Sequence, residues 1–232
     1  SKQARILTDV IPLELDQVRD GSAIVQDEGS QLVAQAFLLA APTGPESAWL
    51  DMCAGPGGKA ALISDSVPPG VEFIAVDLHT HRVELMSKII GPSATLLTGD
   101  ARERPWGNRF FDRVLLDAPC SGLGALRRRP EARWRKTKKQ TLELTELQEE
   151  LLFAAIDSTR VGGIIAYVTC SPYLEETWAV VESVLHARAN VQLEDARSLF
   201  PGVSNLGEGP CVQLWPHVHA TDAMFFALLR RV

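Results

Sequence analysis

Short apolar runs alternate with segments of helical periodicity along most of this 232-residue chain, and this alternation limits the possible folds more than any other feature. Buried strands are expected at the apolar runs 48–50, 71–76, 94–97, 113–116 and 164–168. Helices are expected at 26–41, 57–66, 79–90, 141–160 and 174–187, the fourth ending at the glycine pair 162–163. The alternation predicts an α/β fold with a mostly parallel sheet and helices on both faces.

The remainder of the chain adds strands but no long helix. Strands are expected near 191–193, 212–214 and 224–229, and a final hairpin among them would add an antiparallel edge. The length fits one domain, which we place at 23–232, preceded by an N-terminal tail or remnant of an upstream region at 1–22.

The composition is that of an ordinary soluble globular protein, with 46% hydrophobic and 22% charged residues. Charged side chains interrupt the first twenty residues, so no secretory leader is expected. No apolar run approaches membrane-spanning length. We therefore expect a cytoplasmic protein that has no membrane partner.

Two cysteines lie in short polar motifs that each follow an expected strand. Cys120 lies in the segment 117–122, Asp-Ala-Pro-Cys-Ser-Gly, and Cys170 lies in the segment 169–172, Thr-Cys-Ser-Pro. Ligands bind at the carboxyl ends of the strands in an open α/β sheet. We therefore expect both thiols and the Asp117 carboxylate in one cleft, an arrangement that suits covalent attack on an electrophilic ring.

The spacing of the four cysteines argues against a metal site or a disulfide framework. They form no Cys-x-x-Cys pair, so no zinc ribbon is expected. Disulfides are not expected in a chain without a secretory leader. Cys211 lies in an apolar strand pattern without a polar motif, and we expect it to be a buried packing residue.

A glycine-rich turn between an expected strand and helix indicates a nucleoside cofactor site. Gly55, Gly57 and Ala60 fit the spacing G-x-G-x-x-G/A, which lets a ligand lie against backbone at a helix N-terminus, although the same spacing also fits dinucleotides. Lys59 is expected to point its ammonium group toward the cleft. Acids that follow successive strands can bind polar edges of the cofactor, or each can be a helix N-cap. These acids are Asp77, Asp100 and Asp117.

The net charge of −6 argues weakly against a nucleic-acid partner, but the charge is unevenly distributed. The segment 127–139 carries +7, which leaves −13 for the rest of the chain. A solvated basic loop is the simpler interpretation. Because the segment begins five residues after Gly122, we expect it instead to hold a polyanion at the site, with Trp134 either a stacking platform or a packing residue. The expected RNA contacts are Arg127, Arg128, Arg129, Arg133, Trp134, Arg135 and Lys136.

Taken together and in this order, the motifs resemble the RNA cytosine-5 methyltransferases of the Sun/Fmu type, the family of ribosomal RNA small-subunit methyltransferase B. The resemblance rests on 53–59 (Cys-Ala-Gly-Pro-Gly-Gly-Lys), 117–122 and 169–171, and it extends from Gln-Asp-Glu-Gly-Ser at 26–30 to Phe-Phe at 225–226. It implies a Rossmann-like class I methyltransferase fold, with a seven-stranded sheet and an antiparallel edge strand. It also implies S-adenosylmethionine as the cofactor and RNA, with ribosomal RNA favoured, as the partner. We expect a monomer without a metal.

The resemblance also assigns roles. Cys170 is implied as the nucleophile that adds to carbon 6 of cytosine, and Cys120 as the thiol that assists product release. Lys59 would raise the thiolate fraction, and Asp117 would stabilise charge arriving on the ring. The target base would be single-stranded or flipped out of a duplex. The implied cofactor residues are Cys53, Ala54, Gly55, Pro56, Gly57, Gly58, Lys59, Asp77, Arg82, Asp100 and Asp117.

The chain departs from the family pattern in two motifs. Gly55 stands where members commonly have alanine, a change that the turn should tolerate. The segment 222–226 reads Asp-Ala-Met-Phe-Phe where members usually have Asp-Gly-Phe-Phe, which removes a glycine from that turn. Family proteins generally carry N-terminal RNA-binding domains, and residues 1–22 are too few to form one.

Other functions stay open from the sequence alone. A transfer RNA substrate fits the same chemistry, and a DNA cytosine-5 methyltransferase would use the Pro-Cys thiol, here Cys120, as its nucleophile. A non-catalytic RNA-binding ribosome assembly factor could keep the fold, but it would not need Lys59, Asp117, Cys120 and Cys170 together. A Rossmann dehydrogenase is least favoured, because hydride transfer needs no paired thiols.

Overall fold

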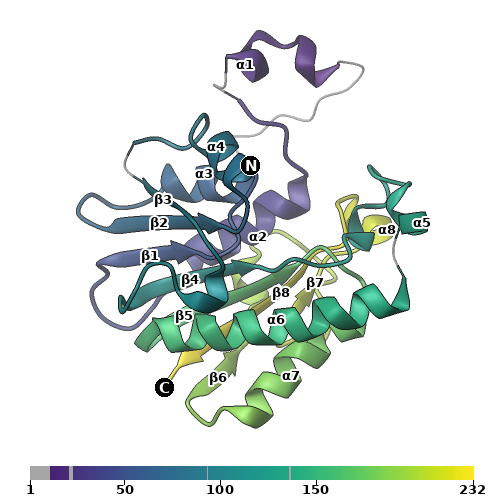
Figure 1. The fold of residues 1–232 in the computed structure, drawn as a ribbon. Coiled ribbons are helices and arrows are strands. Elements are labelled where there is room, and N and C mark those ends of the chain that lie inside the picture. The colour runs from purple at the N-terminus through teal and green to yellow at the C-terminus, as the bar shows by residue number, and fades with distance from the viewer. Residues whose placement is uncertain (1–10, 21–22, 93, 136) are drawn as a thin grey trace.

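The apolar runs of the sequence form the strands of one sheet in the computed structural model, which describes residues 11–20, 23–92, 94–135 and 137–232. In chain order the strands are β1 (Ala48–Asp51), β2 (Glu72–Asp77), β3 (Ala94–Thr98), β4 (Phe111–Asp117), β5 (Thr159–Thr169), β6 (Val191–Glu194), β7 (Val212–Gln213) and β8 (Phe225–Arg231). The order across the sheet is β3-β2-β1-β4-β5-β8-β6, and the short β7 pairs with β8 (Figure 1).

The predicted antiparallel pairing lies at one end of the sheet. Neighbouring strands from β3 to β5 are parallel, whereas β8 runs antiparallel to β5, β6 and β7. The α/β class and the antiparallel end are thus confirmed. The antiparallel strand itself, β8, lies one place in from the edge strand β6. The strand expected near 212–214 is β7, which gives the sheet eight strands where the resemblance implied seven.

Helices cover both faces of the sheet (Figure 1). The longer ones are α2 (Glu28–Leu39), α3 (Gly58–Ser64), α4 (Thr80–Met86), α6 (Lys138–Ser158) and α7 (Trp178–Ala187). Short helices are α1 (Asp16–Arg19), α5 (Ala132–Arg135) and α8 (Pro216–His219), with 3-10 turns η1 (Pro12–Glu14), η2 (Ala101–Glu103), η3 (Leu123–Ala125), η4 (Leu174–Glu176) and η5 (Arg197–Leu199).

Alternate residues of the central strands point into two separate cores. Leu116 of β4 packs with Leu152 of α6 on one face, and Leu115 packs with Phe37 of α2 on the other. All four side chains are fully buried. Successive side chains of a strand point to opposite faces, so a continuous apolar run is the pattern expected of a strand that is covered on both sides.

The predicted end of the long helix at the glycine pair 162–163 is wrong. α6 ends at Ser158, and β5 begins at Thr159. The glycines lie instead within β5, where the register against β4 shifts between Phe111 and Arg113. A Cβ at Gly163 would lie 2.6 Å from Cγ2 of Thr159, so the irregular strand needs glycine there.

Two other predicted helices are shorter than expected. α2 begins at Glu28, after the Asp27 side chain caps it by accepting a 2.9 Å hydrogen bond from the backbone N–H of Gly29. The backbone is already extended at Ala40. The helix expected at 79–90 ends at Met86. Among the described residues, no helix is both long enough and apolar enough to span a membrane.

Candidate active site

The two cysteine motifs meet at the carboxyl ends of β4 and β5. These strands are parallel neighbours that pair Asp117 with Val168, so the loops that follow them start side by side. The Sγ atoms of Cys120 and Cys170 lie 3.4 Å apart, and both residues are half-buried. The structure therefore brings together the two thiols that the sequence analysis expected in one cleft.

The environment makes the two thiols unequal. The hydrogen bond from the Cys120 thiol lowers the pKa of Cys170, and the nearby Lys59 charge acts in the same direction, against the effect of burial. The same hydrogen bond, together with burial, raises the pKa of Cys120 well above its ordinary value. The structure thus favours a Cys170 thiolate that accepts a hydrogen bond from a protonated Cys120.

Lys59 and Asp117 form a buried ion pair next to the thiols. Nζ of Lys59 donates to Oδ2 of Asp117 at 2.8 Å, and the lysine side chain is only 12% exposed. Burial alone would lower the pKa of Lys59, but the charge of Asp117 and its hydrogen bond outweigh burial and raise it. The lysine is therefore a fixed cation at the strand ends, and its ammonium group points toward the cleft as the sequence analysis expected.

Asp51, the last residue of β1, is a buried carboxylate that the sequence analysis did not single out. It is fully buried, and among the described residues neither of its oxygens makes a well-formed hydrogen bond, although the Cys53 backbone N–H is close enough to lower its pKa slightly. Burial, and then the charge of Asp117, raise the pKa of Asp51 to about 8. A buried carboxyl group without a well-formed hydrogen bond is costly unless a ligand compensates it, so Asp51 marks a position for a cationic group.

The glycine-rich turn brings backbone close to the Asp77 carboxylate. Gly55 N–H donates to Oδ2 of Asp77 at 3.1 Å, and Arg82 lies 3.6 Å from the same oxygen. A Cβ at Gly55 would lie 2.4 Å from this oxygen, so glycine fits here as expected, whereas an alanine in this chain would require the carboxylate to shift. Gly57 has a φ of 113°, a conformation that favours glycine and sets the N-terminus of α3.

A pocket continues from this turn along the ends of β1 and β3. Its walls include Met52, Cys53, Asp100, Pro119 and Leu151. Asp100 is bound by Arg102 at 2.6 Å, and its side chain also caps the following turn by accepting from Arg102 N–H. Asp100 thus caps the turn η2 and also lines the pocket, so its N-cap role does not exclude the predicted contact with a cofactor.

This set of groups fits S-adenosylmethionine. The glycine turn is a cradle that a Cβ at position 55 would fill, and the Asp51 carboxyl group, which lacks a well-formed hydrogen bond, is matched to a cationic part of the cofactor. Asp77 is 4% exposed and already accepts from Gly55 and His79 N–H groups, which hold it at the end of β2. Cys53 is half-buried, and desolvation raises its pKa well above the ordinary value, so it contributes as a neutral wall of the pocket.

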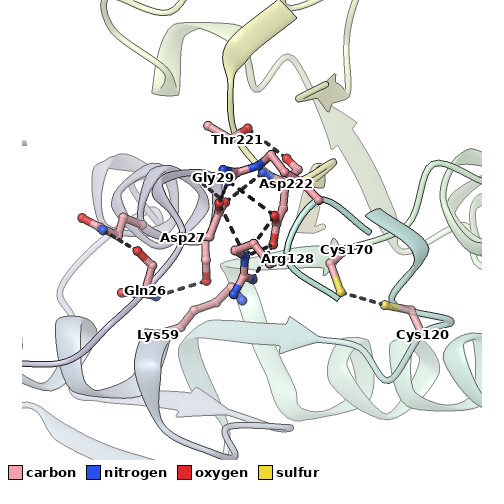
Figure 2. Close-up of polar contacts among 12 residues, drawn as sticks. Gln26, Asp27, Gly29, Lys59, Cys120, Arg128, Cys170, Thr221 and Asp222 are labelled. Atoms are coloured by element: carbon pink, nitrogen blue, oxygen red, sulfur yellow. Dashed lines mark hydrogen bonds and ion pairs between the residues drawn. The ribbon is translucent and has the colours of Figure 1, made fainter. Parts of the chain in front are cut away.

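Part of the basic segment is engaged within the protein. Nη2 of Arg127 contacts Oδ1 of Asp27 at 2.6 Å, and Nη2 of Arg128 contacts Oδ2 of Asp222 at 2.5 Å. The two aspartate side chains are 2% and 3% exposed. Figure 2 shows this cluster beside Lys59 and the two cysteines. Arg127 and Arg128, expected as RNA contacts, therefore first of all attach the segment to α2 and to the loop before β8.

The next part of the segment is open to solvent. Arg129 and Arg133 are exposed, and Trp134 is 82% exposed with the Arg133 guanidinium 5.3 Å from its ring centroid. Trp134 is thus not a packing residue, which was one of the two interpretations of the sequence. Lys136 and the side chain of Arg135 lie outside the described residues.

Backbone contacts join the loops around Cys170. Gly124 N–H donates to the carbonyl of Cys170 at 2.9 Å, and the Gly124 carbonyl accepts from Ala223 N–H at 2.9 Å. A Cβ at Gly124 would lie 2.3 Å from the Ala223 carbonyl oxygen, so only glycine fits. The segment 222–226 therefore packs closely against Gly124 although it lacks the glycine that the family pattern has there.

Glu176 is a second buried carboxylate that the sequence analysis missed. It is fully buried in η4, and Ser121 and Ser171, which directly follow the two cysteines, both donate hydroxyl hydrogen bonds to it at 2.5 Å. Nothing in its sequence setting distinguished it from the exposed Glu175 beside it.

Cys211, the remaining cysteine, belongs to neither of the two cysteine motifs. Cys211 is half-buried against the core, and burial raises its pKa to about 12. In the part of the chain that the structure describes, no group of three or more His, Cys, Asp or Glu side chains is placed to hold a metal ion.

Solved structures that share this fold include proteins named as methyltransferases, among them an S-adenosylmethionine-dependent one from Corynebacterium glutamicum. The chain superposes on PH0851 with a TM-score of 0.83 at 29% identity, covering 97% of this chain and 50% of that one. It superposes on NSun6 from Pyrococcus horikoshii, solved with SFG, with a TM-score of 0.81 at 30% identity, covering 97% of this chain and 57% of that one. The fold and site thus define a class I methyltransferase domain whose cofactor is S-adenosylmethionine.

Within this class, the chain belongs to the 16S rRNA methyltransferase RsmB/F family, whose model matches residues 37–230. It is 52% identical over 224 residues to the Mycobacterium tuberculosis protein Rv1407, which is named as a methyltransferase, with coverage of 95% of this chain and 49% of that protein. It is 35% identical over 216 residues to ribosomal RNA small subunit methyltransferase B of Escherichia coli K12, with coverage of 90% and 47%. The chain therefore spans about half the length of these relatives.

Proposed function

We propose that this chain is the catalytic domain of an RNA cytosine-5 methyltransferase that acts on ribosomal RNA. The observation that carries the proposal is the pair of thiols 3.4 Å apart at the carboxyl ends of β4 and β5, with the pKa of Cys170 lowered and that of Cys120 raised. Membership in the RsmB/F family supports ribosomal RNA as the substrate.

When bound, S-adenosylmethionine supplies an electrophilic methyl group on a sulfonium. The residues that would hold it are those of the glycine turn, with Asp51, Asp77 and Asp100. Carbon 5 of cytosine is a poor nucleophile, so the protein must first activate the ring.

The Cys170 thiolate performs this activation. Its sulfur forms a bond to carbon 6 of the base, and the electron pair of the carbon 5–carbon 6 double bond becomes available at carbon 5 for the methyl group. In this mechanism the ring would lie against Lys59 and Asp117, which are paired at 2.8 Å. The Lys59 ammonium would supply the proton, relayed through Asp117, that neutralises the charge at ring nitrogen 3.

Release restores the aromatic ring. A base removes the proton from carbon 5, the electron pair re-forms the double bond, and the bond between Cys170 sulfur and carbon 6 breaks. Cys120 lies 3.4 Å from the sulfur that leaves, so it is placed to assist directly or through water.

The opposite assignment, with Cys120 as the nucleophile of a DNA cytosine-5 methyltransferase, is disfavoured by electrostatics. The hydrogen bond to Cys170 and burial keep the Cys120 thiol protonated, and a thiol attacks far more slowly than a thiolate.

The exposed part of the basic segment is the proposed RNA surface. Arg129, Arg133 and Trp134 combine positive charge with an aromatic face on the loop that follows Cys120. We expect the double substitution of Arg129 and Arg133 by alanine to weaken RNA binding and to reduce the slope of log affinity against log salt by about 2. Fluorescence titration across salt concentrations measures this slope.

Two single substitutions are compared with the double arginine variant. Trp134→Ala is expected to weaken binding by about 1 kcal/mol or more without changing the salt slope, because it removes stacking and not charge. Lys88→Ala, at an exposed lysine just after α4, is the matched charge control. Equal slopes for all three variants would refute this RNA surface.

Cys120→Ala tests the function directly. The variant is expected to accumulate a covalent protein–RNA adduct that survives a denaturing gel, because Cys170 still adds to carbon 6 while release is impaired. The bond between Cys170 and carbon 6 should form more slowly in the variant than in the unmodified protein, because the variant lacks the hydrogen bond that lowers the pKa of Cys170.

The polymer in the adduct identifies the substrate. The variant is incubated with S-adenosylmethionine and, separately, ribosomal RNA, transfer RNA or DNA, and the Cys120→Ala/Cys170→Ala double variant serves as control. We expect an adduct with ribosomal RNA alone and none in the double variant. An adduct with DNA, or one that persists without Cys170, would contradict the proposal.

A further inference from the structure

The buried carboxylate of Glu176 connects the two cysteine loops. Ser121, which follows Cys120, donates to it from its backbone N–H at 2.6 Å and from its hydroxyl at 2.5 Å. Ser171, which follows Cys170, donates its hydroxyl at 2.5 Å. One carboxylate therefore holds the residue next to each thiol.

The carboxylate is itself fixed from a third direction. Nε2 of Gln148 on α6 lies 3.3 Å from Oε1 of Glu176 and also donates to the Pro119 carbonyl at 2.8 Å. The Tyr167 hydroxyl donates to the Glu176 backbone carbonyl at 2.9 Å and lies 3.3 Å from Oε1 of Gln148. Every contact is buried or partly buried, so water does not compete effectively and the geometry is rigid.

From these contacts we infer that Glu176 is a positioning residue that sets the distance between the thiols of Cys120 and Cys170 and so assigns them different roles. The inference rests on the proposed covalent mechanism. With the carboxylate in place, the Cys120 thiol is held as the hydrogen-bond donor and Cys170 as the acceptor. Without it, the two loops lose their common anchor and the thiols become more alike.

Charged groups around the pair act on the two thiols in different directions. Glu176 faces Cys120 from η4, and its negative charge raises the pKa of that thiol further, after the larger effects of the Cys170 hydrogen bond and burial. Cys170 is approached by Lys59 from α3, Asp117 from β4, Asp222 from the loop before β8 and Arg128 from the basic segment. Of these groups, Asp117 and Asp222 raise the pKa of Cys170 and Lys59 lowers it, so the lowered pKa of Cys170 depends on the hydrogen bond from Cys120 that the two anchored loops hold in place.

Glu176→Gln tests the inference because it keeps the size of the side chain and removes its charge. The rates at which iodoacetamide alkylates Cys120 and Cys170 are followed against pH by peptide mass spectrometry. We expect the midpoint for Cys170 to rise and that for Cys120 to fall, converging by about 1 pH unit. The kcat for methyl transfer should fall on the order of 10- to 100-fold, with the KM for S-adenosylmethionine unchanged.

Controls separate positioning from folding. Glu175→Gln, at the exposed neighbour on the same turn, should leave both midpoints unchanged. If Glu176→Gln does not fold, Ser171→Ala removes one arm alone and should raise the Cys170 midpoint. A loss of stability that leaves both midpoints where they were, or moves them in the same direction, would overturn the inference. Since alkylation needs no RNA, this result is independent of whether the proposed substrate is correct.

Discussion

Cys170→Ala is expected to abolish methyl transfer to RNA, with a loss on the order of 10⁴-fold or more, while S-adenosylmethionine still binds. The substitution removes the atom that activates carbon 5, and the remaining thiol, Cys120, is buried enough that its raised pKa keeps it protonated. The residues proposed to bind the cofactor lie on the turn after β1 and at the ends of β2 and β3, so the affinity measured by calorimetry should be nearly unchanged. Turnover assays with radiolabelled cofactor measure the loss.

Two comparisons make the Cys170 result specific. Cys211→Ala, at a cysteine that packs against the core, should retain activity. In the unmodified protein the rate should rise with pH to a plateau, with a midpoint below the ordinary cysteine value, because the hydrogen bond from Cys120 lowers the pKa of Cys170. Turnover by Cys170→Ala, or a midpoint above the ordinary value, would contradict the assignment.

The site elements that the sequence predicted are those controlled by local pattern. Apolar runs fixed where β4 and β5 would end, and parallel pairing then required Cys120 and Cys170 to be neighbours. The glycine turn and Lys59 followed from the strand-to-helix junction in the same way. These predictions succeed because the determining residues are close together in the chain.

The residues that escaped prediction depend on contacts between distant segments. Asp222 N–H donates to the Asp27 carboxylate across 195 positions of sequence, and Arg128 reaches Asp222 across 94. No periodicity reveals such pairs, so the sequence alone predicts that Arg127 and Arg128 contact RNA in the same way as the rest of the basic segment. Glu176 escaped for a related reason, since an acidic residue in a short polar turn is usually exposed.

Asp51 carries the second large prediction, because burial raises its pKa to about 8 in the folded protein. In the unfolded chain an aspartate has a pKa of about 3.9, so it is ionised above about pH 4. Between these values the folded state holds a proton that the unfolded state has lost, so stability falls as the pH rises from about 4 to about 8. Asp51→Asn, which mimics the protonated form, should remove this contribution to the pH dependence.

We therefore expect Asp51→Asn to raise the free energy of unfolding of the cofactor-free protein by several kcal/mol at pH 8, about 1.4 kcal/mol for each pH unit above about 4, and to change it little at pH 4. The same variant should bind S-adenosylmethionine on the order of 10-fold or more weakly, because it cannot supply the negative charge that compensates a cationic ligand. Denaturant titrations at both pH values and calorimetry of cofactor binding measure the two effects, with the exposed Asp65→Asn as control. A gain in stability together with a loss of affinity would show that the carboxylate is retained for the cofactor at the expense of the fold. A variant that loses stability at pH 8, or binds the cofactor unchanged, would disprove this role.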